Sequence, residues 1–349
     1  MAAIARARAI LWHYAGNCST IECRTPPKTC AGPSVKRPGV PHAQKMNQAT
    51  SPVSSPLPGI ISLLVAMSVL STLDATGKWL MTVGVPLLLL CWVRYSVHLI
   101  LVMSIVIPAK GWQILRTKKP FEQLLRGVFM LSSTMVFFTT LRYLPQAQAT
   151  AINFIAPLIL LAVAPWILKE KAMLSRWIAA LIGFAGIVIV IRPSGGLDPT
   201  GVFFGLSNAV IFSMQFIANR RLAGDNPLTT VIWSGFFGTV VLTVYTLFTL
   251  DEVLEVMAVL DLKQWLLLLS TGVTGGVGHL LQIQAYRHAP ASLLSPFVYL
   301  QIISATALGW LVWNQFPDAV TWLGIGIICA SGIGITLYEL RARPVVVAA

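Results

Sequence analysis

The chain has 349 residues, of which 56% are hydrophobic and only 11% are charged, and its formal net charge is +13. A soluble domain needs roughly 25% charged residues to cover its surface, so this composition excludes an ordinary soluble fold and favours a protein embedded in lipid. The positive charge does not indicate nucleic-acid binding, because the basic residues lie in an N-terminal tail and in loops between apolar runs.

The first 56 residues differ from the rest: they are rich in Pro, Ser, Ala and basic residues and contain no sustained apolar run. We expect 1–56 to be a disordered basic tail. A second methionine, Met46, stands shortly before the first long apolar run. A gene start placed too far upstream is therefore one interpretation of the tail, and an organellar targeting peptide is another.

Ten apolar segments follow, each close to the ~20 residues that a helix needs to cross about 30 Å of hydrocarbon. In chain order they are 57–80, 85–107, 122–143, 147–168, 174–192, 201–219, 227–249, 264–286, 291–312 and 319–339. Breaks containing Pro, Gly and charged residues separate them. The sequence therefore predicts an all-α integral membrane protein of ten transmembrane helices.

Basic residues are distributed unevenly between the two sides that these ten segments define. If the N-terminus is cytoplasmic, the cytoplasmic loops, helix ends and C-terminal tail (341–349) hold thirteen Lys and Arg residues between 110 and 343. The opposite side holds only Lys78, Arg142, Arg192 and Lys263, and its longest loop, 250–263, is acidic. Because cytoplasmic loops carry the excess of basic residues, both termini are predicted to be cytoplasmic.

The two halves of the apolar region repeat one another. Residues 142–185 align without a gap on 287–330, and the first span of each half aligns with an offset of 142. The matched pairs include Arg142/Arg287, Pro145/Pro290, Trp177/Trp322, Gly59/Gly201 and Lys78/Arg220. Each unit, 57–192 and 201–340, then contains five spans. An odd number of spans inserts the second copy upside down, and inverted repeats place a substrate site near the midplane.

Charged residues inside the predicted spans are candidates for function, because a charge in hydrocarbon is costly unless it is paired or faces a cavity. Asp74 and Lys78 are spaced i and i+4 on one face of the first span and can form an ion pair. They are either a gate or substrate contact, or side chains that reach the outer interface. Arg94 lies deep in the second span. It binds either a substrate carboxylate or phosphate, or structural partners such as Asp74 and backbone carbonyls.

Uncharged polar side chains and a histidine within the spans either line a cavity or form interhelical hydrogen bonds. The substrate or gating candidates of this kind are Asn153, Asn208, Gln215, His279, Gln282 and Gln301. His279 is also the residue that would titrate in a proton-coupled cycle.

The sequence contains no motif for catalysis or for a bound cofactor. The glycine-rich run 272–278 lacks the spacing of a phosphate-binding loop and lies in an apolar span, so it indicates close helix packing. The five cysteines fit no zinc pattern, and neither an HExxH sequence nor a nucleophile elbow occurs. We therefore expect no catalytic residues, no metal and no cofactor.

Several of these residues give the chain a family resemblance. It resembles the drug/metabolite transporter superfamily, in particular members built from two EamA domains, over about residues 57–340. The residues that carry the resemblance are Asp74-x-x-x-Lys78, Arg94, Arg142–Pro145 leading into Ala147–Pro157, Trp166–Glu170 and Tyr286–Pro296. One departure is that the ninth span ends in Asn314, Gln315 and Phe316, where such proteins often keep an acid.

The resemblance implies ten helices around a central cavity in a bacterial inner (plasma) membrane, and transport of amino acids, nucleoside-like compounds or other small organic molecules. We expect a secondary transporter that works by alternating access, and not an enzyme. A membrane-embedded transferase would need paired carboxylates or a His-Asp set, and the acids here are few and scattered. A channel or structural membrane component would show pore-lining rings and no inverted repeat. The expected partners are the lipid bilayer and a small-molecule substrate, without nucleic acid, and a homodimer is an open alternative to a monomer.

Overall fold

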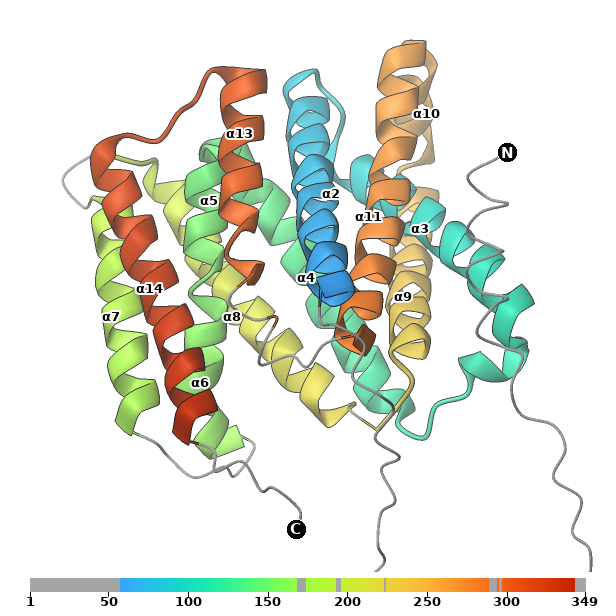
Figure 1. Ribbon diagram of the computed structural model, residues 1–349. Coiled ribbons are helices and arrows are strands. Elements are labelled where there is room, and N and C mark those ends of the chain that lie inside the picture. Colours follow the sequence, from blue (N-terminus) through green and yellow to red (C-terminus); the bar gives the residue numbers. More distant parts are fainter. Residues whose placement is uncertain are drawn as a thin grey trace, which may run out of the picture. The chain divides into compact units, whose positions relative to one another are not determined.

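The computed structural model describes residues 57–167, 174–192, 196–222, 224–288, 294 and 297–342, and helices make up the regular structure of these ranges (Figure 1). The expected basic tail, 1–56, lies outside the described residues, as do residues 343–349 of the expected C-terminal tail.

The helices follow the predicted order of spans. In the first half they are α2 (Leu57–Thr82), α3 (Leu87–Lys110), α4 (Pro120–Tyr143), α5 (Gln146–Asn153), α6 (Ala156–Ile167) and α7 (Leu174–Ile191). In the second half they are α8 (Pro199–Arg221), α9 (Pro227–Phe248), α10 (Leu250–Val259), α11 (Leu262–His288), α13 (Gln301–Trp313) and α14 (Ala319–Ala342). A short 3-10 helix, Trp112–Leu115, follows α3.

Seven of the described helices are long and apolar enough to cross a membrane: α2, α3, α4, α8, α9, α11 and α14. Three shorter apolar helices, Gln146–Leu160, Trp177–Ile191 and Gln301–Trp313, lie in the fourth, fifth and ninth predicted spans. The expected all-helical membrane fold is confirmed.

Local sequence explains several helix boundaries. α8 and α9 each begin with a proline, whose fixed φ suits the first turn and whose missing N–H costs nothing there. Before these prolines, Asp198 accepts hydrogen bonds from two backbone N–H groups of the first turn of α8, and Asn226 accepts one from that of α9. α3 ends at Gly111, whose φ of 72° favours glycine.

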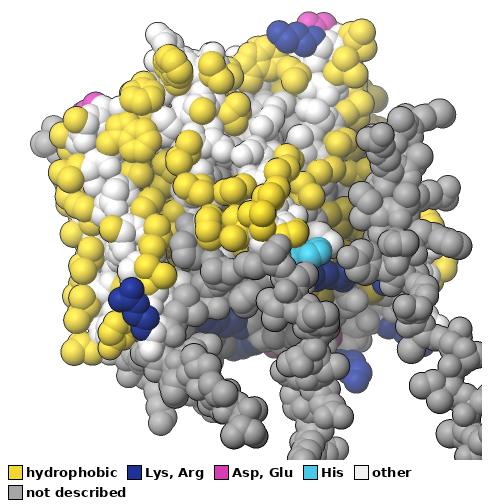
Figure 2. All heavy atoms as spheres, in the orientation of Figure 1, with side chains coloured by type: hydrophobic (Ala, Val, Ile, Leu, Met, Phe, Trp, Pro, Cys, Tyr) yellow, Lys and Arg dark blue, Asp and Glu magenta, His cyan; other side chains and the backbone are white. Residues whose placement is uncertain are grey.

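The outer faces of the helices expose large hydrophobic side chains. Ile100 is 68% exposed, Phe203 is 66% exposed and Leu311 is 73% exposed. Figure 2 shows hydrophobic side chains spread over the visible face, with charged side chains toward its upper and lower margins. Apolar patches of this extent do not face water in soluble proteins, whereas a bilayer accommodates them.

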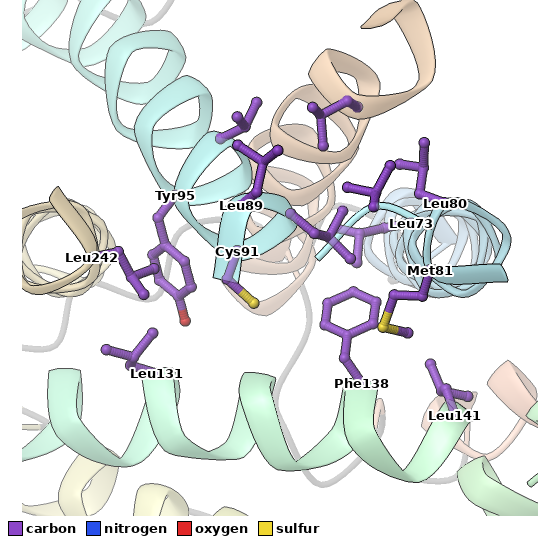
Figure 3. Close-up of a cluster of buried hydrophobic side chains, with 14 of the residues drawn as sticks. Leu73, Leu80, Met81, Leu89, Cys91, Tyr95, Leu131, Phe138, Leu141 and Leu242 are labelled. Atoms are coloured by element: carbon purple, nitrogen blue, oxygen red, sulfur yellow. The ribbon is translucent and has the colours of Figure 1, made fainter. Parts of the chain in front are cut away.

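Inside the bundle, α2, α3, α4 and α9 enclose a hydrophobic cluster (Figure 3). Phe138 of α4 is 1% exposed and lies against Gly77 of α2, where any Cβ would overlap its ring. Tyr95 of α3 lies in the same way against Gly238 of α9. Glycine at these two positions lets the helices approach closely, as small residues do at membrane helix interfaces.

Equivalent helices of the two halves pack against equivalent neighbours. α2 packs against α11 and α13, and its counterpart α8 packs against α4 and against α5 and α6, which are the corresponding partners. Likewise α3 packs against α11 as α9 packs against α4. α3 with α9, and α7 with α14, are pairs of counterparts that contact each other directly. This pattern requires a pseudo-two-fold axis between the halves.

Counterpart helices run in opposite directions. Lys78, near the end of α2, donates a hydrogen bond to the carbonyl oxygen of Leu144 over 2.7 Å. Gly201, near the start of α8, lies against the same residue, because a Cβ there would be 2.7 Å from Leu144 Cγ. The end of α2 and the start of α8 are therefore on the same side of the bundle. The expected pair of inverted five-helix repeats is confirmed.

Two predicted segments differ in detail from their expected form. The span 147–168 is interrupted between Asn153 and Ala156. Pro157 explains the break, because it has no N–H to donate to the carbonyl of Asn153 and its ring crowds that carbonyl. The predicted outer loop 250–263 contains the helix α10, whose first turn carries acidic residues that favour a helix N-terminus.

An ion pair joins the end of α7 to the start of α14. Arg192, which follows α7, donates to the carboxylate of Asp318. Asp318 in turn accepts a hydrogen bond from the backbone N–H of Thr321, in the first turn of α14. The Arg192 guanidinium is the main reason why the pKa of Asp318 is well below its usual range, so this carboxylate stays charged at neutral pH.

Candidate functional site

The ninth predicted span is also interrupted, by a turn at residues 299–300 before α13, and this break meets the break of the fourth span between the halves. Phe154, in the turn between α5 and α6, and Tyr299, just before α13, have ring centroids 5.1 Å apart. These residues correspond under the 145-residue offset of the repeat, so their contact lies at the pseudo-two-fold axis. Gly332 of α14 makes room for Tyr299, because any Cβ there would overlap the tyrosine hydroxyl. Discontinuous helices at a repeat interface are where inverted-repeat carriers form their substrate sites.

Arg94, a predicted candidate, is buried on α3 and reaches toward α4. Its Nη1 donates a hydrogen bond to Thr134 Oγ1 at 3.0 Å, and the hydroxyl of Tyr95 lies 3.0 Å from the same oxygen. The guanidinium also lies over the rings of Tyr95 and Phe138, 5.3 and 5.9 Å from their centroids. Among the described residues no carboxylate pairs with Arg94. The site thus holds a cation between aromatic rings, with most of its N–H donors unused.

One turn further along α3, the His98 ring packs against glycines of α9 and α11. A Cβ at Gly235 of α9 would be 3.1 Å from its Cδ2, and a Cβ at Gly276 of α11 would be 3.7 Å from its Nδ1. His279 of α11 meets it edge to face, with ring centroids 5.8 Å apart. His98 is 5% exposed, and its Nε2 has no hydrogen-bond partner. A buried polar atom without a partner is costly unless a ligand or water satisfies it.

Arg126 of α4 is a third buried basic group near this centre. Its Nε donates to Asn219 Oδ1 at 2.7 Å, and its Nη1 donates to Ser234 Oγ and to the carbonyl oxygen of Thr230. All of these partners are neutral. Both Arg94 and Arg126 lie within electrostatic range of His98 and Tyr95.

Asp74 and Lys78 lie on α2 but do not form the ion pair that their spacing allows. Lys78 is buried and donates to Leu144, and its ammonium lies 5.1 Å from the ring centroid of Trp313 in α13. Asp74 is half-buried, and within the described part of the chain no cation pairs with it. It lies in electrostatic range of Arg94. Through its contacts with Leu144 and Trp313, Lys78 joins the ends of α2, α4 and α13.

Two predicted candidates bind each other. Asn208 of α8 donates to Asn153 Oδ1 at 2.8 Å, and its own Oδ1 accepts from the hydroxyl of Ser133 in α4 at 2.8 Å. Asn153 is the last residue before the break in the fourth span. The bridge therefore holds the interrupted helix against the second half.

The other predicted candidates are more dispersed. Gln215 is buried on α8, and Gln282 is half-buried on α11, three residues after His279. Gln301 begins α13, where its carbonyl oxygen accepts a 3.4 Å hydrogen bond from Ser71 of α2. The contacts of these three side chains do not join them to Arg94.

Sequence reasoning did not select Arg126, Thr134, Ser133 or Tyr95 as site residues. The sequence places Arg126 among the charges at the cytoplasmic end of a span, whereas in the structure it lies six residues inside α4. Its place within an apolar span, six residues after the start of α4, was the available signal. The hydroxyl groups carried no such signal, because Ser and Thr are common in membrane helices and their partners come from other helices.

A small groove opens between α2 and α13. It has a volume of about 220 Å³ and is lined by Leu64, Met67, Ser68, Leu300, Ile303 and Ser304. The hydroxyls of Ser68 and Ser304 are 3.0 Å apart across it. Binding pockets for drug-sized ligands are roughly 300–1,000 Å³, so we interpret this groove as a seam between the halves and not as the substrate site. In the described residues no group of three or more His, Cys, Asp or Glu side chains is arranged to hold a metal ion.

Comparison with known proteins agrees with this architecture. The sequence model of the EamA-like transporter family matches residues 57–192 and again 199–337. An S-adenosylmethionine uptake transporter of Rickettsia bellii is 26% identical over 233 residues, covering 66% of this chain and 78% of the relative. A riboflavin transporter of Vibrio cholerae is 26% identical over 300 residues, covering 82% of this chain and 95% of the relative. A crystal structure with 20% identity has the same fold, with a TM-score of 0.56 over 82% of this chain and 98% of that one.

Proposed function

The chain belongs to the EamA-like transporter family and transports small metabolites across a membrane, and we propose that it is a secondary carrier for a nucleoside-like or related heteroaromatic compound. The single observation that supports a carrier mechanism best is the meeting of two interrupted helices at the axis between inverted repeats. Such halves can exchange conformations and open a central site to each side in turn.

The site that we assign to the substrate lies around Arg94. Tyr95 and Phe138 flank this guanidinium and are 3% and 1% exposed, so they can stack on a heterocycle only in a conformation that separates the helices around them. The relatives named as S-adenosylmethionine and riboflavin transporters both handle compounds with a heteroaromatic ring joined to a polar chain. This shared chemistry favours a heteroaromatic substrate over a simple amino acid.

The proposed membrane is the bacterial inner membrane, with both chain ends in the cytoplasm. The excess of basic residues on one side supports this orientation, and the transporters named above come from bacteria. The side that carries Lys78, Arg192 and Asp318 then faces outward. The family and these relatives are transporters, which gives the transferase alternative no support.

Counterflow in proteoliposomes tests the proposal. Liposomes containing the purified chain are loaded with unlabelled riboflavin or S-adenosylmethionine, and uptake of the labelled compound is measured. We expect uptake of one of them to saturate with concentration and to be accelerated by the same compound inside. Arg94→Gln should reduce uptake by about tenfold or more, because a hydrogen bond to a charged group is lost. Arg116→Gln removes an exposed arginine and is the matched control.

Uptake that rises linearly with concentration and is not accelerated by internal substrate would favour a channel and contradict the carrier mechanism. Saturable uptake at the normal rate by Arg94→Gln would remove Arg94 from the site. Failure to transport any heteroaromatic compound, with an active control substrate, would contradict the proposed substrate class.

A further inference from the structure

Buried positive charges outnumber buried negative charges among the described residues of the bundle. Among the described residues, the charged side chains that are buried are Lys78, Arg94 and Arg126, whereas no Asp or Glu is buried to the same degree. Two acids near these cations are half-buried: Asp74, in electrostatic range of Arg94, and Glu122, one turn before Arg126 on α4. Charges inside a membrane protein normally pair with one another, so an excess of cations indicates that an anion enters from outside the chain.

Arg94 and Arg126 both have donors to spare. A guanidinium has five N–H donors in a planar fork. Arg94 uses one of them on Thr134, and the contacts of Arg126 occupy its Nε and Nη1 but not its Nη2. The remaining donors suit the paired oxygens of a carboxylate or phosphate, which arginine binds with two parallel hydrogen bonds.

His98 supplies a second, independent indication of a ligand. It is 5% exposed, and its Nε2 makes no hydrogen bond of good geometry, although the backbone of Val231 in α9 lies within interaction range of the ring. Its ring faces Gly235 of α9, where a Cβ would be 3.6 Å from Nε2. The preceding residue, Ser234, holds Arg126, and Arg94 lies one turn before His98 on α3. Both arginines therefore lie in electrostatic range of His98, and a Cβ at Gly275 of α11 would be 3.7 Å from Arg94 Nε and 3.9 Å from His98 Nδ1.

We propose that Arg94, His98 and Arg126 form an anion-binding site, and that the transported metabolite carries a carboxylate or phosphate group bound there. The inference rests on the proposed transport function and specifies the substrate: the aromatic rings beside Arg94 hold the heterocycle, and the two arginines hold the acidic group. Arg126 is in this account a binding residue, and Thr134, Asn219 and Ser234 position the two guanidinium groups.

Thermal unfolding of the purified full-length chain in detergent tests the site without any transport step. Inorganic phosphate and acetate are titrated separately, with chloride replaced to keep the ionic strength constant. A ligand that binds only the folded state raises Tm as its concentration passes Kd, and we expect a saturable rise of roughly 2–4 °C with at least one anion. A rise with phosphate alone indicates a phosphate-bearing substrate, and a rise with acetate alone indicates a carboxylate.

Four variants complete the experiment. Arg94→Gln and Arg126→Gln should each abolish the anion-dependent rise, Arg126→Lys should keep part of it because the charge is retained, and the exposed Arg116→Gln should keep all of it. If Arg126→Gln does not fold, the comparison of Arg94→Gln with wild type and the intermediate value expected for Arg126→Lys still decide the outcome.

A Tm that responds to neither anion more than to chloride would overturn the anion site, as would an undiminished rise in both glutamine variants. Saturable counterflow of riboflavin, which carries neither a carboxylate nor a phosphate, would overturn this inference as well. Because counterflow is measured separately, saturable counterflow of either compound without an anion response would leave the carrier proposal standing and remove only this inference.

Discussion

Asn208, near the middle of α8, makes two hydrogen bonds to the first half of the chain. It is 1% exposed, donates to Asn153 and accepts from Ser133. The three residues come from α8, from the end of α5 and from α4. In a membrane interior, water cannot replace these partners, so each side chain depends on the other two.

Replacing Asn208 by leucine keeps the size of the side chain but removes both hydrogen bonds. The buried Ser133 and the half-buried Asn153 would then each lose this partner, and we expect the free energy of unfolding to fall by about 1–3 kcal/mol. SDS-induced unfolding from mixed micelles measures the difference. Thr72→Val is the control, because the hydroxyl of Thr72 is exposed and bonds only to its own helix. Equal stability of the two variants would contradict a structural role for the bridge.

The sequence predicts which polar side chains are energetically costly to place in the membrane interior, but not which of them form hydrogen bonds with one another. Arg94, Asn153 and Asn208 were selected because charged and amide groups in apolar spans need partners. The spacing of Asp74 and Lys78 favoured a pair between them, but Lys78 reaches the carbonyl of Leu144 instead. That carbonyl is near the end of another helix, and helix-to-helix register is absent from a single sequence.

The fourth span shows how one residue shapes an element. Hydropathy alone predicts a continuous helix over 147–168, because the run around the break is apolar apart from Asn153. Pro157 lies in the first turn of α6, where proline is tolerated, and separates that helix from α5. The same reasoning was available from the sequence, but proline also occurs within membrane helices without a break, as Pro108 does in α3.

Pro157→Ala should join α5 and α6 into one helix, because alanine restores the N–H that the carbonyl of Asn153 lacks. We expect thermal stability to be equal or higher and the rate of riboflavin or S-adenosylmethionine counterflow to fall several-fold, since the two half-helices can no longer move separately. Pro108→Ala, which removes an exposed proline near the end of α3, is the matched control. A counterflow rate equal to that of the control would show that the break is not needed for transport.

At the scale of the whole molecule, the account depends on two inverted halves that move against each other. The five-span repeat and its inversion could be predicted because an odd number of spans fixes the orientation of the second copy. The packing of α2 against α11 and of α8 against α4 could not be predicted, because the repeat indicates which helices are equivalent but not which of them are neighbours.

The seam between α2 of the first half and α13 of the second gives direct access to this motion. The hydroxyl oxygens of Ser68 and Ser304, which stand where the two sulfurs of a cysteine pair would stand, are 3.0 Å apart. A shift of about 1 Å would bring two sulfurs to the S–S bond length of about 2 Å. The measurement is counterflow by a Ser68→Cys/Ser304→Cys double variant, before and after oxidation, in a chain whose native cysteines have been replaced.

If the halves must separate along this seam to change access, oxidation stops counterflow, reduction restores it, and neither single variant responds. Counterflow that continues at the full rate after the two cysteines are completely cross-linked would contradict exchange between the halves as the transport mechanism.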